Sequence, residues 1–452
     1  MIKITIENVV YSRVKTPDIS LVKPLLSVVY QKAKYNPQTR KSSYVEHSES
    51  LINSRGILLS GYIPRLKKCL SDKQIPYEVD NRSERLKASN GPIIKGKTLR
   101  DDQARLVESA VKNQRGILVA PTGSGKTLLA GAIISCFPGK KALFLCDKKS
   151  LAYQAAEDFR EYGLKNVTLV GDGTKDVSGN IVVAIQKSLI GLDLSYLSTM
   201  FDIIILDESH HLAAKDSQHA SIIRSLLAPI RIGLTATYPS DQRIQLIMEG
   251  LLGPIIGELT EEEAKEKNII ADTKVIIRKI DFDQEVIECR NYHNARKVGI
   301  ISNRGYNKKV VQEAISWIKE GKSVLISFIE TEHGKYLKSI ADELGLKCEL
   351  LYGDTSMPIR EKVKSDFKAK KIMCVIASTI WREGINIPSL DVVINAAGGK
   401  SDIAIKQLKG RGTRQYEGKE MLYYVDFFNP NHDSFIKHFG FRMCMYFENG
   451  WM

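Results

Sequence analysis

The sequence predicts an α/β protein with two tandem parallel-sheet domains, preceded by a small α+β N-terminal domain. Two observations predict this fold class. From residue 98 onward, short apolar runs alternate with amphipathic stretches of helical length, and several of those runs are continuously apolar, as in parallel strands covered on both faces. A length of 452 residues accommodates two or three domains, and a hydrophobic content of 43% is ample for their cores. We expect the domains at 1–90, 91–260 and 261–452.

The first 90 residues are expected to form a strand, a helix, further strands, a second helix and a last strand. Residues 1–7 alternate apolar and polar side chains as a strand does. Residues 23–34 are interpreted as a helix, although Val28, Val29 and Tyr30 weaken that interpretation. The remaining expected elements are a strand at 56–60, a helix at 64–70 with Pro64 in its first turn, a strand at 77–79 and a polar linker at 81–97.

Apolar runs in the rest of the chain mark the strands of the two parallel sheets. The second sheet is expected to begin between residues 258 and 283. The expected strands are 116–120, 142–146, 168–170, 181–185, 202–206 and 231–234 in the first sheet, and 323–328, 348–351, 373–377, 392–395 and 422–425 in the second.

The charge balance points to a polyanionic partner. The net charge is +14, and residues 1–90 hold +8 of it, with 16 Lys and Arg against 8 Asp and Glu. Nucleic acid is the usual partner of such a protein, and a solvated basic face without a partner is the alternative. No stretch of 18 apolar residues occurs, so we expect no membrane partner. The seven cysteines are scattered, with no zinc-binding spacing, and are expected to be reduced thiols.

A glycine-rich loop at 120–127 follows one expected strand and precedes a helical run. Gly123 and Gly125 allow backbone N–H groups to turn inward on phosphates, and the helix N-terminus adds the positive end of its dipole. Lys126 can reach the β- and γ-phosphates, and the Thr127 hydroxyl can hold Mg²⁺. The loop therefore predicts a nucleotide-phosphate site that also includes Thr122 and Ser124.

Two adjacent carboxylates, Asp207 and Glu208, follow another expected strand of the same domain. Ligands of α/β sheets bind at the carboxyl ends of strands. Asp207 is expected to hold Mg²⁺ together with Thr127, and Glu208 to orient and polarise the attacking water.

With these motifs in order across residues 99–414, the chain resembles the superfamily 2 DExH helicases, which have two RecA-like domains. Residues 207–210 match their DExH motif, and residues 99–103 match the adenine-reading segment, which implies Gln103 on the base edge. Residues 235–237 match the segment that links hydrolysis to strand movement, which implies coupling roles for His210, Thr235 and Thr237. The resemblance implies ATP and Mg²⁺ as cofactors.

The second domain carries the remaining family motifs. Residues 378–388 match motif V, which implies Glu383 and Gly384 near the nucleotide, with Asn386 where many members have Asp. Residues 407–414 match motif VI, which implies a catalytic Gln407 and two arginine fingers, Arg411 and Arg414. Guanidinium groups suit the charge that develops on the γ-phosphate.

Four stretches correspond to the segments that line the nucleic-acid groove in the family: 147–154, 184–188, 327–331 and 378–381. Short hydroxyls suit phosphate contacts, which position a strand without reading its sequence. Trp381 is expected either to stack on a base or to pack in the core. The candidate contact residues are Gln186, Ser188, Ser378, Thr379 and Trp381.

The N-terminal part, with its helix near Pro64 and the strand at 77–79, resembles the small N-terminal domain of phage branch-migration helicases of the UvsW kind. The implied function is ATP-driven, non-sequence-specific remodelling of branched DNA, with recombination or replication proteins as partners. The implied location is the cytoplasm, or the host cytoplasm for a phage-encoded protein. An RNA helicase or RNA-dependent ATPase, and a motor subunit recruited by a nuclease or recombinase, are the alternatives.

Overall fold

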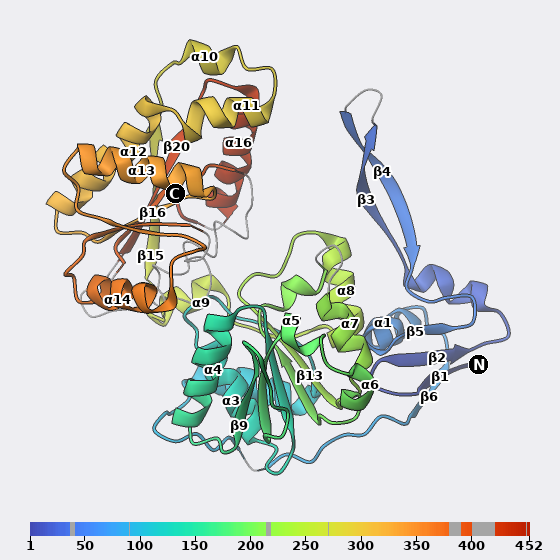
Figure 1. The fold of residues 1–452 in the computed structure, drawn as a ribbon. Coiled ribbons are helices and arrows are strands. Elements are labelled where there is room, and N and C mark those ends of the chain that lie inside the picture. The colour runs from blue at the N-terminus through green and yellow to red at the C-terminus, as the bar shows by residue number, and fades with distance from the viewer. Residues whose placement is uncertain are drawn as a thin grey trace. The chain divides into compact units, whose positions relative to one another are not determined.

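Figure 1 shows the fold in a computed structural model, which describes residues 1–36, 41–89, 91–213, 218–269, 271–378, 390–399, 421–448 and 450–452. The described chain forms two compact units. The first comprises Met1–Ala120 and Gly125–Thr260, and the second comprises Pro121–Ser124 and Glu261–Met452. The expected fold class, a small α+β region followed by two parallel-sheet domains, is confirmed.

A four-stranded sheet of order β5-β2-β1-β6 begins the first unit. Strand β1 pairs antiparallel with β2 and parallel with β6, and helix α1 packs Leu66 and Leu70 into the same core as Ile4 of β1. The elements of this part are β1 (Ile2–Ile6), β2 (Tyr11–Lys15), η1 (Ile19–Leu21), η2 (Lys23–Leu26), β5 (Ile57–Leu59), η3 (Ser60–Tyr62), α1 (Ile63–Asp72) and β6 (Tyr77–Asn81).

Between η2 and β5 the chain forms a separate two-stranded antiparallel ribbon of β3 (Ser27–Asn36) and β4 (Lys41–Ser50), which extends away from the four-stranded sheet (Figure 1). The expected helix over 23–34 is therefore wrong. Only a short 3₁₀ turn forms, and a strand follows it. Val28, Val29 and Tyr30 pair with residues of β4 across the ribbon, and Tyr30 also donates a hydrogen bond to Glu49 at 2.8 Å. These partners favour the strand over the local helical tendency.

The first parallel sheet has eight strands in the order β10-β9-β11-β8-β12-β13-β7-β14. All neighbours run parallel except β10 and β9. Helices α2 and α4 each pack against α3, and α7 and α8 pack on the core that contains β7, β8, β11 and β12. The strands are β7 (Arg115–Val119), β8 (Ala142–Cys146), β9 (Val167–Gly171), β10 (Thr174–Lys175), β11 (Ile181–Ile185), β12 (Ile203–Leu206), β13 (Ile230–Thr235) and β14 (Ile255–Glu258). The helices are α2 (Asp101–Asn113), α3 (Lys126–Ser135), α4 (Lys149–Glu161), α5 (Gln186–Leu189), α6 (Leu194–Leu197), η4 (Ser209–Ala213), α7 (Gln218–Ser225) and α8 (Gln242–Leu252).

The second unit holds a six-stranded, fully parallel sheet of order β15-β20-β19-β16-β18-β17. One core cluster joins it to α12 and α13, and another joins it to α14 and α16. The strands are β15 (Asp272–Lys279), β16 (Val324–Ser327), β17 (Glu349–Leu351), β18 (Cys374–Ala377), β19 (Val392–Asn395) and β20 (Met421–Phe428). The helices are α9 (Glu261–Glu266), α10 (Gln284–Ile287), α11 (Tyr292–Arg296), η5 (Lys297–Ile301), α12 (Arg304–Lys319), α13 (Thr331–Glu343), α14 (Met357–Lys368) and α16 (Asp433–Glu448).

The N-terminal sheet is docked on the first parallel-sheet domain through helix α8. Tyr62 donates its hydroxyl hydrogen to the Leu246 carbonyl at 2.8 Å, and Arg65 forms two hydrogen bonds with Glu249. From the parallel sheet, Arg115 donates to the Val9 carbonyl at 3.1 Å and to the Leu252 carbonyl at 3.2 Å. The basic N-terminal part is therefore fixed to the first parallel-sheet domain, and the two together form the first unit.

Candidate functional site

The phosphate loop has the backbone that its glycines predict. Gly123 and Gly125 have φ of +96° and +90°, in the region that favours glycine. Helix α3 begins at Lys126 with Gly125 as its N-cap, and the ammonium of Lys126 lies 3.5 Å from the Ala120 carbonyl. Thr127 follows in the first turn of the helix. These features fit the expected cradle for a nucleotide phosphate.

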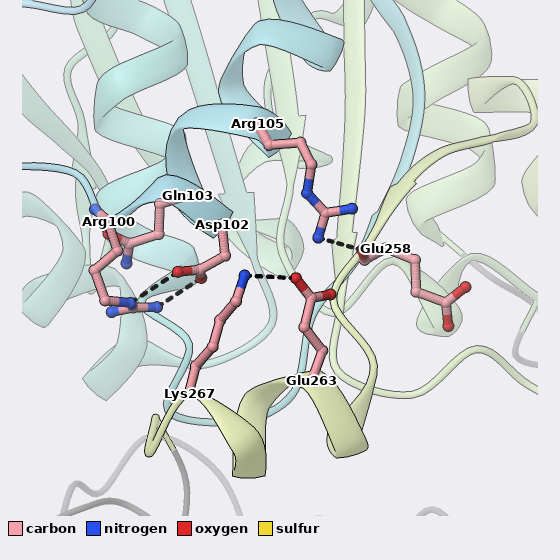
Figure 2. Close-up of polar contacts among 7 residues, drawn as sticks. All are labelled: Arg100, Asp102, Gln103, Arg105, Glu258, Glu263 and Lys267. Carbon is pink, nitrogen blue, oxygen red and sulfur yellow. Dashed lines mark hydrogen bonds and ion pairs between the residues drawn. The ribbon is translucent and has the colours of Figure 1, made fainter.

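Helix α2 places Gln103 against this loop. Figure 2 shows Gln103 beside Arg100 and Asp102 at the start of that helix. Its amide oxygen accepts the Arg100 backbone N–H at 3.1 Å, and Arg100 in turn forms an ion pair with Asp102 at 2.9 Å. A Cβ on Gly125 would lie 2.7 Å from the Gln103 amide nitrogen and would displace that side chain, and the φ of +90° at this position also favours glycine. Gln103 therefore lies next to the loop, and adenine reading stays its predicted role.

Two further polar contacts drawn in Figure 2 involve no residue of the predicted phosphate site. Arg105 donates to the Glu258 carbonyl at 3.2 Å, which fixes α2 to the end of β14. In the second unit, Lys267 and Glu263 form an ion pair at 2.7 Å along α9. Both contacts are structural in character, since neither involves a candidate site residue.

The two carboxylates stand directly after β12, as expected. The Asp207 backbone N–H donates to the Leu145 carbonyl at 2.9 Å, and Glu208 has a left-handed backbone with φ of +47°. Burial, assisted by the charge of Glu208, raises the pKa of Asp207 to about 7, and the ammonium of Lys126 opposes both. The buried Oδ1 of Asp207 accepts no hydrogen bond from the described residues.

That Asp207 oxygen fits a divalent cation. A buried carboxylate oxygen that lacks a donor is satisfied by a hard cation, and Mg²⁺ prefers oxygen ligands from one or two carboxylates and from phosphates. Thr127 and Asp207 are the residues that would hold it. When bound with ATP, the ion would neutralise charge that develops on the phosphates.

His210 links the acid pair, Asp207 and Glu208, to the end of β13. Its Nδ1 lies 3.1 Å from the Thr235 hydroxyl and 3.4 Å from the Glu208 carboxylate. The Thr235 hydroxyl donates its hydrogen to the Thr237 carbonyl at 2.9 Å, so Nδ1 of His210 must carry the proton that it shares with Thr235. The three residues that the family resemblance names for coupling thus form one buried chain of contacts with Glu208 at its end.

Asp147 is a residue that the sequence reasoning missed as a site residue. It follows β8, and its carboxylate contacts His219 of α7 at 2.7 Å and His211 at 3.4 Å. Gln186 completes this cluster, because its amide can donate to Asp147 at 3.1 Å and accept the His219 backbone N–H at 3.0 Å. Asp147 lay in a stretch already assigned to the nucleic-acid groove, whereas no motif marked His219.

The structure places two of the expected phosphate-contacting hydroxyls. Ser188 lies in α5, and Ser378 follows β18 with its N–H bonded to the Leu351 carbonyl at 3.0 Å. Seven expected residues lie outside the described part of the chain: Thr379, Trp381, Glu383, Gly384, Gln407, Arg411 and Arg414. Their roles stay predictions. Within the described residues, no helix is both long and apolar enough to cross a membrane.

Two family models match the chain at the two parallel-sheet domains. Residues 96–240 match the model described as the type III restriction enzyme, res subunit. Residues 306–415 match the model described as the helicase conserved C-terminal domain. The first match contains the phosphate loop, the acid pair and Thr235, and the second contains the stretches of motifs V and VI.

Named helicases match over most of the chain. Probable helicase D10 of Escherichia phage T5 is 27% identical over 423 residues, 92% of this chain and 89% of its own length. The ATP-dependent DNA helicase uvsW of Enterobacteria phage T4 is 24% identical over 334 residues, 70% of this chain and 66% of its own. A solved structure of Saccharomyces cerevisiae Dbp5, bound to RNA and ADP BeF3, shares the fold with a TM-score of 0.58 at 16% identity, over 79% of this chain and 89% of its own.

Proposed function

Because the chain belongs to the superfamily 2 helicases and hydrolyses ATP, we propose that it uses this hydrolysis to remodel branched DNA. The substrates are forks, D-loops, R-loops and Holliday junctions, and the setting is recombination, repair or replication. The reaction is not sequence-specific, since its contacts are with phosphates and with base faces.

Residues of the first unit support the proposed hydrolysis of ATP. Lys126 and the α3 N-terminus would bind the phosphates, Thr127 and Asp207 would hold Mg²⁺, and Glu208 would orient the attacking water. Catalysis of phosphoryl transfer depends mainly on positioning and on electrostatic stabilisation, so few groups suffice. Arg411 and Arg414 would supply the positive charge from motif VI.

The observation that supports DNA as the substrate is the basic N-terminal part, which is fixed to helix α8. Residues 1–90 hold 16 Lys and Arg against 8 Asp and Glu, and Tyr62 and Arg65 fix them to the helix that follows the coupling residues. Exposed Lys3 of β1 stands directly opposite exposed Lys15 of β2. Like charges at paired positions are unfavourable. Glu78 of β6, which pairs with Lys3 on its other side, offsets one of these two charges, and a DNA phosphate is an anion that would offset the other.

The similarity to the ATP-dependent DNA helicase uvsW supports DNA over RNA. An ATPase assay of the full chain with single-stranded, duplex, forked and four-way DNA, and with matching RNA, tests the proposal. We expect the forked and four-way DNA to give the strongest stimulation. Stronger stimulation by RNA would establish the alternative of an RNA helicase. Stimulation without strand displacement would favour a motor subunit that acts with a nuclease or recombinase.

The two paired lysines can be tested directly. Replacing Lys3 and Lys15 with Gln should weaken junction binding. On duplex DNA, the slope of log K against log salt should become shallower by about 0.9 for each phosphate that the variant no longer neutralises. Arg13→Gln is the matched control, because Arg13 also lies in β2 but already pairs with Glu7 at 2.6 Å. Equal salt slopes for wild type and the double lysine variant would contradict the assignment of this face.

A further inference from the structure

Asp147 stands where three neighbouring strands of the first parallel sheet end. Strand β8 lies between β11 and β12, with Cys146 paired to Ile185 and Leu145 paired to Leu206. Asp147 is the next residue after β8, and Gln186 is the next residue after β11. His211 follows shortly after β12, in η4. One carboxylate can therefore reach side chains from both flanking strand ends.

The contacts of Asp147 use both of its oxygens. Oδ1 bonds Nε2 of His219 at 2.7 Å, and Oδ2 lies 3.4 Å from Nε2 of His211. With its amide turned to satisfy both of its ends, Gln186 can also donate to Oδ1 at 3.1 Å. His219 comes from α7, which belongs to none of the three strand ends. The cluster of Asp147, Gln186, His211 and His219 is called the Asp147 cluster below.

The Asp147 cluster is too enclosed to be a chance surface contact. His219 is only 4% exposed, and Asp147 and His211 are partly shielded. Burial alone would raise the pKa of Asp147, yet the hydrogen bond and charge of His219 hold that pKa below its usual value. The described residues contain no group of three His, Cys, Asp or Glu side chains arranged for a metal ion, so a metal site does not explain the cluster.

Two chemically different regions meet in this cluster. On one side, His211 neighbours His210, with ring centroids 4.2 Å apart, and His210 contacts both Thr235 and the Glu208 carboxylate. On the other side, Gln186 begins α5, which holds Ser188 and falls in a stretch expected to contact nucleic-acid phosphates. A displacement of Gln186 would therefore be felt by Asp147, by His211 and then by the turn that carries Glu208.

We propose that Asp147 and His219 are positioning residues that couple nucleic acid bound at α5 to the orientation of Glu208. His219 fixes one oxygen of Asp147, and the other oxygen then lies 3.4 Å from Nε2 of His211, in the turn behind it. The inference rests on the proposed function, because it requires nucleic acid to stimulate ATP hydrolysis. Neither residue touches the reacting atoms, so both act through the His210 and Glu208 turn.

The test measures ATP turnover of the full chain against ATP concentration, with and without saturating single-stranded oligodeoxythymidylate. Asp147→Ala and His219→Ala should each lower the DNA-stimulated kcat by about tenfold or more, the range seen when an orienting side chain is removed. Basal turnover and the KM for ATP should change much less than the stimulated kcat does. Asp147→Asn should recover part of the stimulation, because the amide oxygen still accepts the His219 hydrogen bond.

Asp202→Asn is the matched control. Asp202 precedes β12 at the opposite end of the strand, where it accepts the Lys141 backbone N–H at 2.8 Å, so its variant should keep full stimulation. The double variant D147A/H219A should be no worse than D147A, because residues that act as one unit are not additive.

Three outcomes would overturn the coupling. In the first, D147A is stimulated as strongly as wild type. In the second, D147A loses ATP affinity, basal turnover and stimulation together, which is the pattern of a general structural role. In the third, the two alanine variants are fully additive. A wild-type chain that no nucleic acid stimulates would remove the proposed function itself, and the coupling with it.

Discussion

Arg65 and Glu249, 184 positions apart in the sequence, join the N-terminal sheet to helix α8 through two parallel hydrogen bonds. Nε of Arg65 lies 2.9 Å from Oε1 of Glu249, and Nη2 lies 2.6 Å from Oε2. The Glu249 side chain is 12% exposed, and its hydrogen bonds with Arg65 raise the pKa of the guanidinium. The two-point geometry fixes both distance and orientation.

Breaking this pair should loosen the docking of the N-terminal part. A double-mutant cycle of R65A and E249A, followed by thermal unfolding of the full chain, should give a coupling free energy of about 1 kcal/mol, the upper range for pairs with partial exposure. Arg13→Ala, which removes a more exposed ion pair with Glu7, serves as the comparison. A coupling energy near zero would mean that Tyr62 and the backbone contacts alone hold the junction.

Lys126→Ala should abolish ATP hydrolysis while nucleic-acid binding stays largely intact, since the lysine serves the phosphates and not the strand groove. The loss in kcat should be about 100-fold or more, as for other single groups that stabilise transition-state charge. Steady-state ATPase and filter binding of labelled DNA measure the two properties. Lys140→Ala, in a residue that pairs with Asp202 at 3.3 Å, is the lysine control. Normal turnover of the Lys126 variant would refute the phosphate-loop assignment.

Glu208→Gln should bind ATP and stop hydrolysis, with a loss of about 100-fold or more, because an amide cannot polarise water as a carboxylate does. Asp207→Asn should instead weaken Mg²⁺-dependent ATP binding. Nucleotide binding titrated with and without Mg²⁺ separates the two. If both variants lose Mg²⁺–ATP binding equally, the division of roles between the acids is incorrect.

Arg411→Ala and Arg414→Ala should each lower kcat far more than ATP affinity. Arginine fingers contribute about 10³–10⁵-fold to the rate of phosphoryl transfer in related enzymes. The check is a comparison of kcat with the dissociation constant of ATP for each variant. Wild-type kcat in either variant would remove that arginine from the catalytic set.

His333 should make the second unit sensitive to acid. Burial lowers the pKa of His333 to about 4 from an ordinary 6.5, and its Nε2–H donates to Asn307 at 2.9 Å. Since the folded pKa lies below the unfolded one, the unfolded chain takes up the proton first, and stability falls as the pH drops from about 6.5 to about 4. The loss should approach about 3 kcal/mol.

Hydrogen exchange in α12 and α13 between pH 7 and about pH 4.5, corrected for intrinsic exchange rates, measures this loss. His333→Gln keeps a donor for Asn307 and should flatten the pH dependence. His293→Gln, at an exposed position of the same unit, should leave it unchanged. An unaltered pH profile in the His333 variant would assign the acid sensitivity to other groups.

Local sequence predicted the sheets well because buried parallel strands are continuous apolar runs. The expected strands at 142–146, 181–185 and 392–395 match β8, β11 and β19 residue for residue. The phosphate loop and the acid pair were found in the same way, because short motifs after such strands define them. The prediction for residues 23–34 was wrong, because their strand depends on partners in β4.

Contacts between residues far apart in the chain could not be predicted from the sequence. His219 carries no motif, and its bond to Asp147 exists only because α7 packs beside the end of β8. The docking of the N-terminal part on α8 likewise depends on two side chains that are 184 positions apart in the sequence. Residues 81–97 were expected to separate two domains, yet the bodies on either side touch through Tyr62, Arg65 and Arg115.

The backbone packing at this junction limits how the gene could be recombined. A Cβ on Gly61 would overlap the Glu249 carbonyl oxygen, and a Cβ on Gly250 would lie 2.6 Å from the ring of Tyr62. The two surfaces therefore fit only when both positions lack a side chain. The N-terminal part is not an interchangeable module: a chimaera that grafts it onto another motor must bring a glycine at the equivalent point of the receiving helix.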